Sequence, residues 1–168
     1  MAARMLTRSE TNLALVTRHL RVPIDEAFRV FQPACIASDR LVIVEPAGAR
    51  DTEMPLHVSH PLTYIGQIWN TCRVALSATV EVPHGMAADI RAQCIAGAGR
   101  GVLPESLVKA DIAAGRLSIR QTTADLGYSL SLFCSPQASR RARRIWSLAV
   151  EGRNPQQDVP RVVLPGRS

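Results

Sequence analysis

The sequence predicts an α/β fold, and the stretch from Met86 to Leu117 predicts it most clearly. Within it, Met86, Ile90 and Cys94 recur at helical spacing, which indicates an amphipathic helix. Glycine accepts positive φ at low cost, so we expect the helix to end at the three spaced glycines Gly97, Gly99 and Gly101. The order helix, glycine turn, short strand, helix and strand is typical of an α/β domain.

The second half of this stretch supplies that strand, helix and strand. Val102 and Leu103 predict a short buried strand, and Pro104 suits the first turn of the next helix. Gly115 ends that helix, and Leu117–Ile119 begins another strand. The glycines do not predict a phosphate loop, because in a dinucleotide fingerprint they follow a strand and open a helix.

The residues before this stretch predict four more strands, Leu13–Val16, Leu41–Val44, Leu62–Ile65 and Thr79–Val82. We expect residues 1–11 to be a frayed start. Residues 17–39 are compatible with either a short helix or a surface loop. A shortened helix is expected over Ile68–Leu76, and Pro83, His84 and Gly85 form a turn.

The C-terminal part predicts a strand over Tyr128–Cys134, with Leu130, Leu132 and Cys134 on one face. Ser135 and Pro136 are a helix start signal. We expect Gly152 to end the helix and residues 151–168 to be disordered. The predicted core-facing stripe of this helix consists of Ala138, Ala142, Ile145, Trp146 and Ala149.

Composition narrows the class of protein. No apolar run approaches the ~20 residues that a membrane span needs. The four widely spaced cysteines favour small buried thiols in a reducing compartment, and therefore the cytoplasm. The net charge is +6, carried almost entirely by arginine. Because no aromatic residues alternate with these arginines, we expect solvated surface rather than a nucleic-acid site.

No metal centre or catalytic group is predicted, and no cofactor is implied. His57, His60, Cys72 and His84 lack the spacing of a ligand set, since Pro55 and Pro61 bracket the first two in an expected loop. Cys94 lies on an apolar helix face and Cys134 in a strand, where neutral thiols pack well. The sequence therefore favours a non-enzymatic protein.

The run CIAGAGRGVLPESLVKADIAAGRL, residues 94–117, resembles the effector-binding domain of LysR-type transcriptional regulators. That family has a helix, a glycine-rich turn, a Leu-Pro pair and a helix that ends in Gly-Arg-Leu. The resemblance extends over roughly residues 13–150 through four further segments, TNLALVT, RLVIVEPAG, HPLTYIGQ and YSLSLFCSPQASRRARRIWSLA.

The resemblance implies a two-subdomain fold like that of type 2 periplasmic binding proteins. Residues 1–45 would be a partial subdomain one, 46–127 subdomain two, and 128–150 the return strand and closing helix of subdomain one. The family's N-terminal helix-turn-helix, linker helix and first strands have no counterpart in the sequence, so subdomain one is expected to be incomplete. Arg100 also departs from the family, which usually has an apolar residue there.

The implied function is small-molecule effector binding and dimerisation in a regulator of transcription, with DNA contacted only through a missing N-terminal domain. The resemblance places the effector-binding residues at Thr63, Tyr64, His84, Gly85 and Arg100. Arg100 would pair with a carboxylate effector in bidentate fashion. Three alternatives stay open: a stand-alone small-ligand-binding protein, a non-functional regulator fragment, and an enzyme that uses a cysteine or a histidine.

Overall fold

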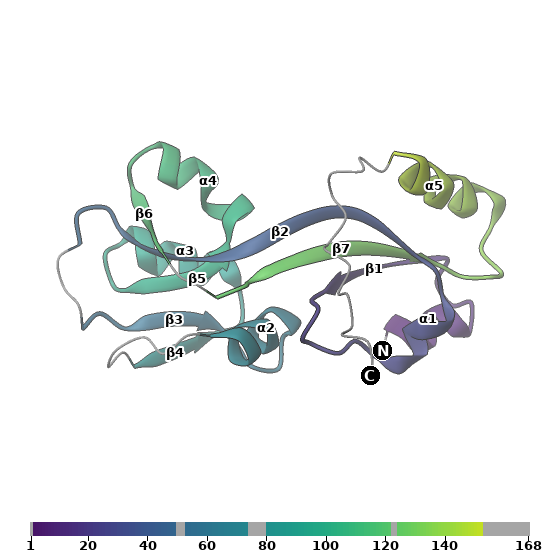
Figure 1. Ribbon diagram of the computed structural model, residues 1–168, viewed down its shortest axis with the longest axis horizontal. Helices are drawn as coiled ribbons and strands as arrows, with labels where there is room; N and C mark the ends of the chain where they lie inside the picture. The colour runs from purple at the N-terminus through teal and green to yellow at the C-terminus, as the bar shows by residue number, and fades with distance from the viewer. Residues whose placement is uncertain (1, 50–52, 74–79, 122–123, 153–168) are drawn as a thin grey trace, which may run out of the picture. The chain divides into compact units, whose positions relative to one another are not determined.

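The structure is a computed structural model that describes residues 2–49, 53–73, 80–121 and 124–152. The chain divides into two compact units. Unit 1 comprises Met1–Arg18, Ile24–Ser38 and Ser129–Ser168, and unit 2 comprises His19–Pro23 and Asp39–Tyr128. Two long strands, β2 (Pro33–Pro46) and β7 (Gly127–Cys134), belong in part to each unit (Figure 1). The predicted disordered tail lies almost wholly outside the described residues.

Unit 1 consists of paired strands and the helices that pack near them. Strand β1 (Leu13–Arg18) pairs antiparallel with β7, from Leu13 opposite Cys134 to Arg18 opposite Ser129. Helix α1 (Ala2–Thr7) and helix α5 (Arg140–Glu151) lie on opposite sides of these strands in Figure 1, and a 3₁₀ helix, η1 (Glu26–Val30), precedes β2. The core of unit 1 consists of Ala3, Leu6, Ala14, Phe28, Phe31 and Phe133.

Three expectations for unit 1 are wrong. Residues 2–7 form a helix instead of a frayed start, because Ala3 and Leu6 are buried in the core. Strand β2 begins eight residues earlier than the predicted Leu41. Helix α5 begins at Arg140, since Ser139 is the residue whose hydroxyl caps it, accepting from the Ala142 N–H.

The predicted stripe of α5 is only partly buried. Ala138 and Ala142 are buried, Trp146 and Ala149 are half-buried, and the Ile145 side chain is 50 % exposed. Strand β7 also buries the face opposite to its most apolar one. Ser129, Ser131 and Phe133 are buried, while Leu130, Leu132 and Cys134 are half-buried. Hydrophobicity alone therefore did not identify the inner face.

Unit 2 has a mixed sheet in which β3 (Leu56–Ser59) lies between β4 (Glu81–His84) and β5 (Arg100–Pro104). Both neighbours run parallel to β3, whereas β5 and β6 (Leu117–Arg120) run antiparallel to β2. The helices of unit 2 are α2 (Tyr64–Cys72), α3 (Ala87–Ile95) and α4 (Glu105–Ala113).

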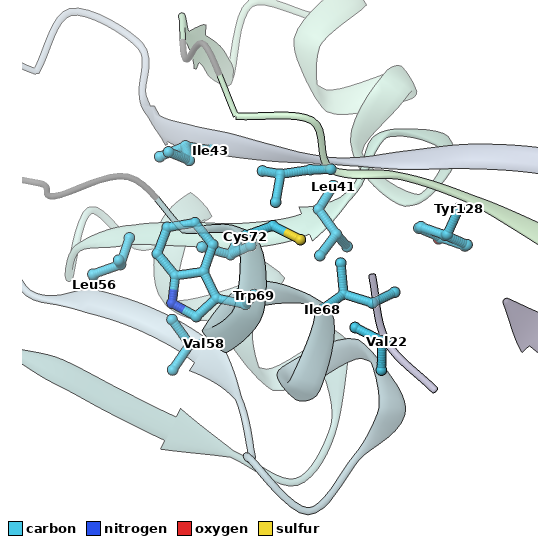
Figure 2. Close-up of a cluster of buried hydrophobic side chains, with 11 residues drawn as sticks. Val22, Leu41, Ile43, Leu56, Val58, Ile68, Trp69, Cys72 and Tyr128 are labelled. Atoms are coloured by element: carbon cyan, nitrogen blue, oxygen red, sulfur yellow. The ribbon is translucent and has the colours of Figure 1, made fainter. Parts of the chain in front are cut away.

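Two apolar clusters cover the two faces of this sheet. On one face Ile68 and Trp69 of α2 pack on Leu56 and Val58, with Val22 beside them (Figure 2). On the other face α3 and α4 pack on β2, β5 and β6 through Val42, Val44, Ile90, Cys94, Leu103, Val108 and Leu117. The strand residues alternate between the clusters, as Val102 and Leu103 show.

The sequence predicted most elements of unit 2. The helices over residues 87–95 and 105–113, and the strands around Val102 and over Leu117–Ile119, are confirmed. The strand predicted at Leu62–Ile65 is wrong, because the Thr63 hydroxyl caps a helix that begins at Tyr64. The strand predicted at Thr79–Val82 is instead β4, and it includes Pro83 and His84, which were expected in a turn.

Candidate functional site

The carboxyl ends of β3 and β4 meet the amino end of α2. Ser59 is paired with His84, and the His60 N–H donates to the His84 carbonyl at 2.8 Å. Thr63 caps α2, since its hydroxyl accepts from the Gly66 N–H and donates to the His60 carbonyl. A side chain on Gly66 would collide with the backbone of Ser59 and His60, so only glycine lets α2 approach this closely.

A pair of histidines connects this edge with the start of β3, where His57 is opposite Gly101 of β5. The Nδ1 atom of His57 is 2.8 Å from Nε2 of His84, and the ring centroids are 4.9 Å apart. The His57 Nε2 atom lies 3.4 Å from the Ala98 carbonyl, which can only accept a hydrogen bond. His57 therefore donates from Nε2 to Ala98 and accepts at Nδ1, and His84 donates from Nε2. The Nδ1 atom of His84, which has no hydrogen-bond partner in the part of the chain that the structure describes, completes the polar group.

Helix α3 begins beside the same edge without a side-chain cap. Its N-cap residue is Met86, whose side chain makes no capping hydrogen bond. Gly85 precedes it, is exposed, and has no atom within 4 Å of where a Cβ would lie. Uncapped N–H groups at a helix start carry partial positive charge. Thr63, His84 and Gly85 are thus brought together at one edge of unit 2.

The Tyr64 hydroxyl makes structural hydrogen bonds to residues 19–23. Its hydroxyl donates to the Val22 carbonyl at 2.8 Å and accepts from the His19 N–H at 3.0 Å. The Cys72 Sγ atom lies 3.7 Å from Nε2 of His19, at the other end of α2. Burial raises the pKa of the Cys72 thiol, which keeps it protonated at neutral pH. Both contacts attach residues 19–23 to α2.

Arg100 lies at the opposite end of β3. It is opposite Leu56 in the register, so the length of β3, about 10 Å, separates it from the Ser59–His84 edge. The residue is 4 % exposed, and its Nε atom donates to Glu45 at 3.2 Å. The guanidinium is thus occupied by a carboxylate of the protein itself. The structure does not bring it to the edge that holds Thr63 and His84.

A second polar group in unit 2 surrounds Asp39. Its carboxylate accepts from the hydroxyls of Ser106, at 2.6 Å, and Tyr128, at 3.1 Å. Burial, together with Asp39, raises the pKa of Tyr128, so it stays a phenol. The hollow beside this group has a volume of about 370 Å³ and is lined by Asp39, Glu105, Ser106, Lys109, Ile112 and Ile119.

Sequence reasoning missed His57, Glu45 and Asp39 as members of polar groups. Pro55 and Pro61 made the segment around His57 look like a loop, although Leu56 and Val58 alternate with polar residues as in a strand. The carboxylates of Glu45 and Asp39 find partners 55 and 67 residues away, respectively, for which no sequence signal exists. Among the described residues, no group of three or more potential metal ligands lies together, and none of their helices is long and apolar enough to cross a membrane.

No protein-family model matches the sequence, and no curated protein matches it. Solved structures do. DarR from Vibrio fischeri in complex with DNA matches with a TM-score of 0.70, at 14 % identity, over 89 % of this chain and 53 % of that chain. The regulatory domain of HypT from Salmonella typhimurium, as an M206Q mutant, matches with a TM-score of 0.69, at 18 % identity, over 90 % and 78 %.

The chain has the fold of a LysR-type regulatory domain. This fold is of the type 2 periplasmic-binding-protein kind, as the resemblance predicted. Full-length LysG from Corynebacterium glutamicum with bound effector Arg also matches, with a TM-score of 0.62, at 15 % identity, over 88 % of this chain and 53 % of that one. The chain spans about half the length of the full-length LysR-type regulators it matches and 78 % of the HypT regulatory domain.

Proposed function

We propose that this chain is the small-molecule effector-binding region of a LysR-type transcriptional regulator. The observation that carries the proposal is the match of nine-tenths of the chain to regulatory domains at TM-scores near 0.7. The matched proteins are transcriptional regulators, and LysG binds its effector Arg. The proposal gives the chain no catalytic role and places it in the cytoplasm as a homo-oligomer. Promoter recognition would belong to a helix-turn-helix domain.

The proposed effector contacts are Thr63, His84 and Gly85, on the edge where β3, β4 and the starts of α2 and α3 meet. The start of α3 offers N–H groups without a side-chain cap, which suit an anionic part of an effector such as a carboxylate. The His84 Nδ1 atom has no partner among the described residues, and because the proton lies on Nε2 it accepts a hydrogen bond from a donor group of the effector, such as an ammonium or hydroxyl. Tyr64 and Arg100 would support the site indirectly. Tyr64 would do so through its hydrogen bond to the Val22 carbonyl, and Arg100 through its hydrogen bond to Glu45.

Isothermal titration calorimetry with a panel of free amino acids, including arginine, and simple mono- and dicarboxylates tests the proposal. We expect at least one compound to bind, and we expect His84→Gln to abolish that binding. Glutamine can still donate an amide hydrogen bond to His57, so this variant keeps the fold while it removes the free ring nitrogen. His60→Gln, an exposed histidine beside the site, is the matched control and should bind normally.

Absence of binding across the panel would contradict the proposed function. Equal binding by wild type and His84→Gln would contradict the site while leaving the function standing. The two failures are therefore distinguishable.

A further inference from the structure

The outward face of α5 in unit 1 is a cluster of arginines without acidic partners. Arg140, Arg141 and Arg144 are exposed, and no carboxylate in the described part of the chain forms an ion pair with any of them. Residues three and four apart on a helix are neighbours, so the three guanidinium groups share one side. Ala142, which is buried, marks the opposite side.

Arg143, on the same helix, has a structural role. Its guanidinium donates to the carbonyls of Ala138 and Pro136, at 2.9 and 2.8 Å, and so ties down the segment before the helix. Arg140, Arg141 and Arg144 have no such hydrogen bonds among the described residues. Their charges are available to a partner.

The position of the arginine cluster destabilises α5. The amino end of a helix carries partial positive charge, and the first turn of α5 has no acidic residue to offset it. Arg140 and Arg144 are also like charges four residues apart, an arrangement that destabilises a helix. Both effects are removed when an anion lies against this face. Local stability alone would not select three arginines here.

We propose that the Arg140–Arg141–Arg144 face of α5 binds the phosphate backbone of duplex DNA without reading its sequence. Guanidinium groups match phosphate geometry in bidentate fashion, and DNA presents one negative charge per ~1.7 Å of its axis. Several phosphates can therefore reach three guanidiniums on one helical turn. Trp146, the aromatic residue of α5, lies on the side of the helix that carries the buried Ala142, so it is not placed beside the arginines to stack on bases, and the contact is electrostatic. This goes beyond the proposed function, in which DNA is contacted by a separate domain.

The test is fluorescence anisotropy with a labelled duplex of arbitrary sequence, about 20 base pairs long, at NaCl concentrations between about 50 and 200 mM. The full chain is compared with the triple variant Arg140→Gln, Arg141→Gln, Arg144→Gln. The matched control removes the same total charge from arginines that already have a carboxylate partner, Arg8→Gln, Arg29→Gln and Arg73→Gln.

We expect the wild type to bind with a Kd of roughly 10⁻⁶ to 10⁻⁴ M near physiological salt, as is typical of non-specific binding. In the α5 variant the slope of log K against log salt concentration should become shallower by about 0.9 for each phosphate that the variant no longer neutralises. The control variant should keep most of the wild-type slope. The melting temperature of the α5 variant should equal or exceed that of wild type, which shows that loss of binding is not loss of folding.

Three outcomes would overturn the proposal. The first is that the wild type does not bind the duplex at about 50 mM NaCl. The second is that the slope of log K against log salt concentration falls equally in the two triple variants, which would show that binding depends only on the total charge of the protein. The third is that poly-glutamate displaces the duplex and binds through the same three arginines as tightly as DNA does, which would assign the face to an acidic protein.

Discussion

The Nδ1 atom of His57 and the Nε2 atom of His84 lie 2.8 Å apart and share one proton. His57 comes from β3, His84 from β4, and the second nitrogen of His57 faces the carbonyl of Ala98 in the glycine turn. The pair therefore links three separate segments of unit 2, and its His84 lies at the edge where we place the effector. His57 is 6 % exposed, so water cannot easily replace a missing partner.

His84→Ala should lower the free energy of unfolding by about 1–3 kcal/mol, because it leaves the buried acceptor of His57 unsatisfied. His84→Gln should cost less, since its amide can donate to the same nitrogen. Urea denaturation followed by circular dichroism measures both. If the alanine and glutamine variants are equally stable, the hydrogen bond does not hold the pair.

The Asp111 carboxylate should make stability depend on pH in the acid range. It is fully buried and accepts hydrogen bonds from Arg91 and Arg116. These bonds lower its pKa from 3.8 to about 2, so the ionised form is favoured in the folded state. Its contribution is complete above pH 3.8 and is lost as pH falls through about 2.

We therefore expect Asp111→Asn to be less stable than wild type at pH 6, with the difference shrinking as pH falls from about 4 towards 2. Denaturant titrations at stepped pH values measure it. A difference that is constant over this range would contradict the assignment to Asp111.

Gly101→Ala should destabilise unit 2 by about 1–3 kcal/mol through overpacking. A Cβ atom at this position would lie 2.5 Å from Cys94 Sγ and 2.7 Å from Ile90 Cγ2, both on α3. Gly85→Ala is the control, because its Cβ would have open space. Thermal unfolding compares the two variants, and equal melting temperatures would show that α3 does not pack this closely on β5.

Tyr64→Phe should release residues 19–23 from α2. The substitution removes the hydroxyl that bridges the Val22 carbonyl and the His19 N–H, at a cost of about 1–2 kcal/mol. Hydrogen exchange at the His19 amide should speed up selectively. Tyr128→Phe, which removes a hydroxyl that donates to Asp39, is the control and should leave that amide unchanged.

The stretch from residue 86 to 117 was predictable because its signals are local. The spacing of Ile90 and Cys94 identifies a helix face, and Gly97 and Gly115 have positive φ as helix-ending glycines do. The role of Gly101 was not predictable in this way. It ends no helix, and it lies in β5, where α3 comes too close for a side chain.

Wrong predictions arose where two local signals compete. Thr63 caps a helix, but the apolar residues around it are equally compatible with a strand, and only the approach of α2 to Ser59 and His60 decides between them. Ser135 and Ser139 are both plausible helix caps. The Ser135 hydroxyl accepts from the Gln137 N–H at 3.3 Å within a turn, whereas the Ser139 hydroxyl accepts from the Ala142 N–H and caps α5.

The sequence by itself determined the α/β class and most elements of unit 2, since these depend on periodicity, caps and glycines within a few residues. The likeness of its ordered motifs to a known family also predicted the fold. Only the tertiary structure decided which polar side chains meet. His57 and His84 are 27 residues apart, Arg100 and Glu45 are 55 apart, and Tyr128 and Asp39 are 89 apart. A buried polar group takes whichever partner the packed strands bring within about 3 Å, and that choice has no local signal.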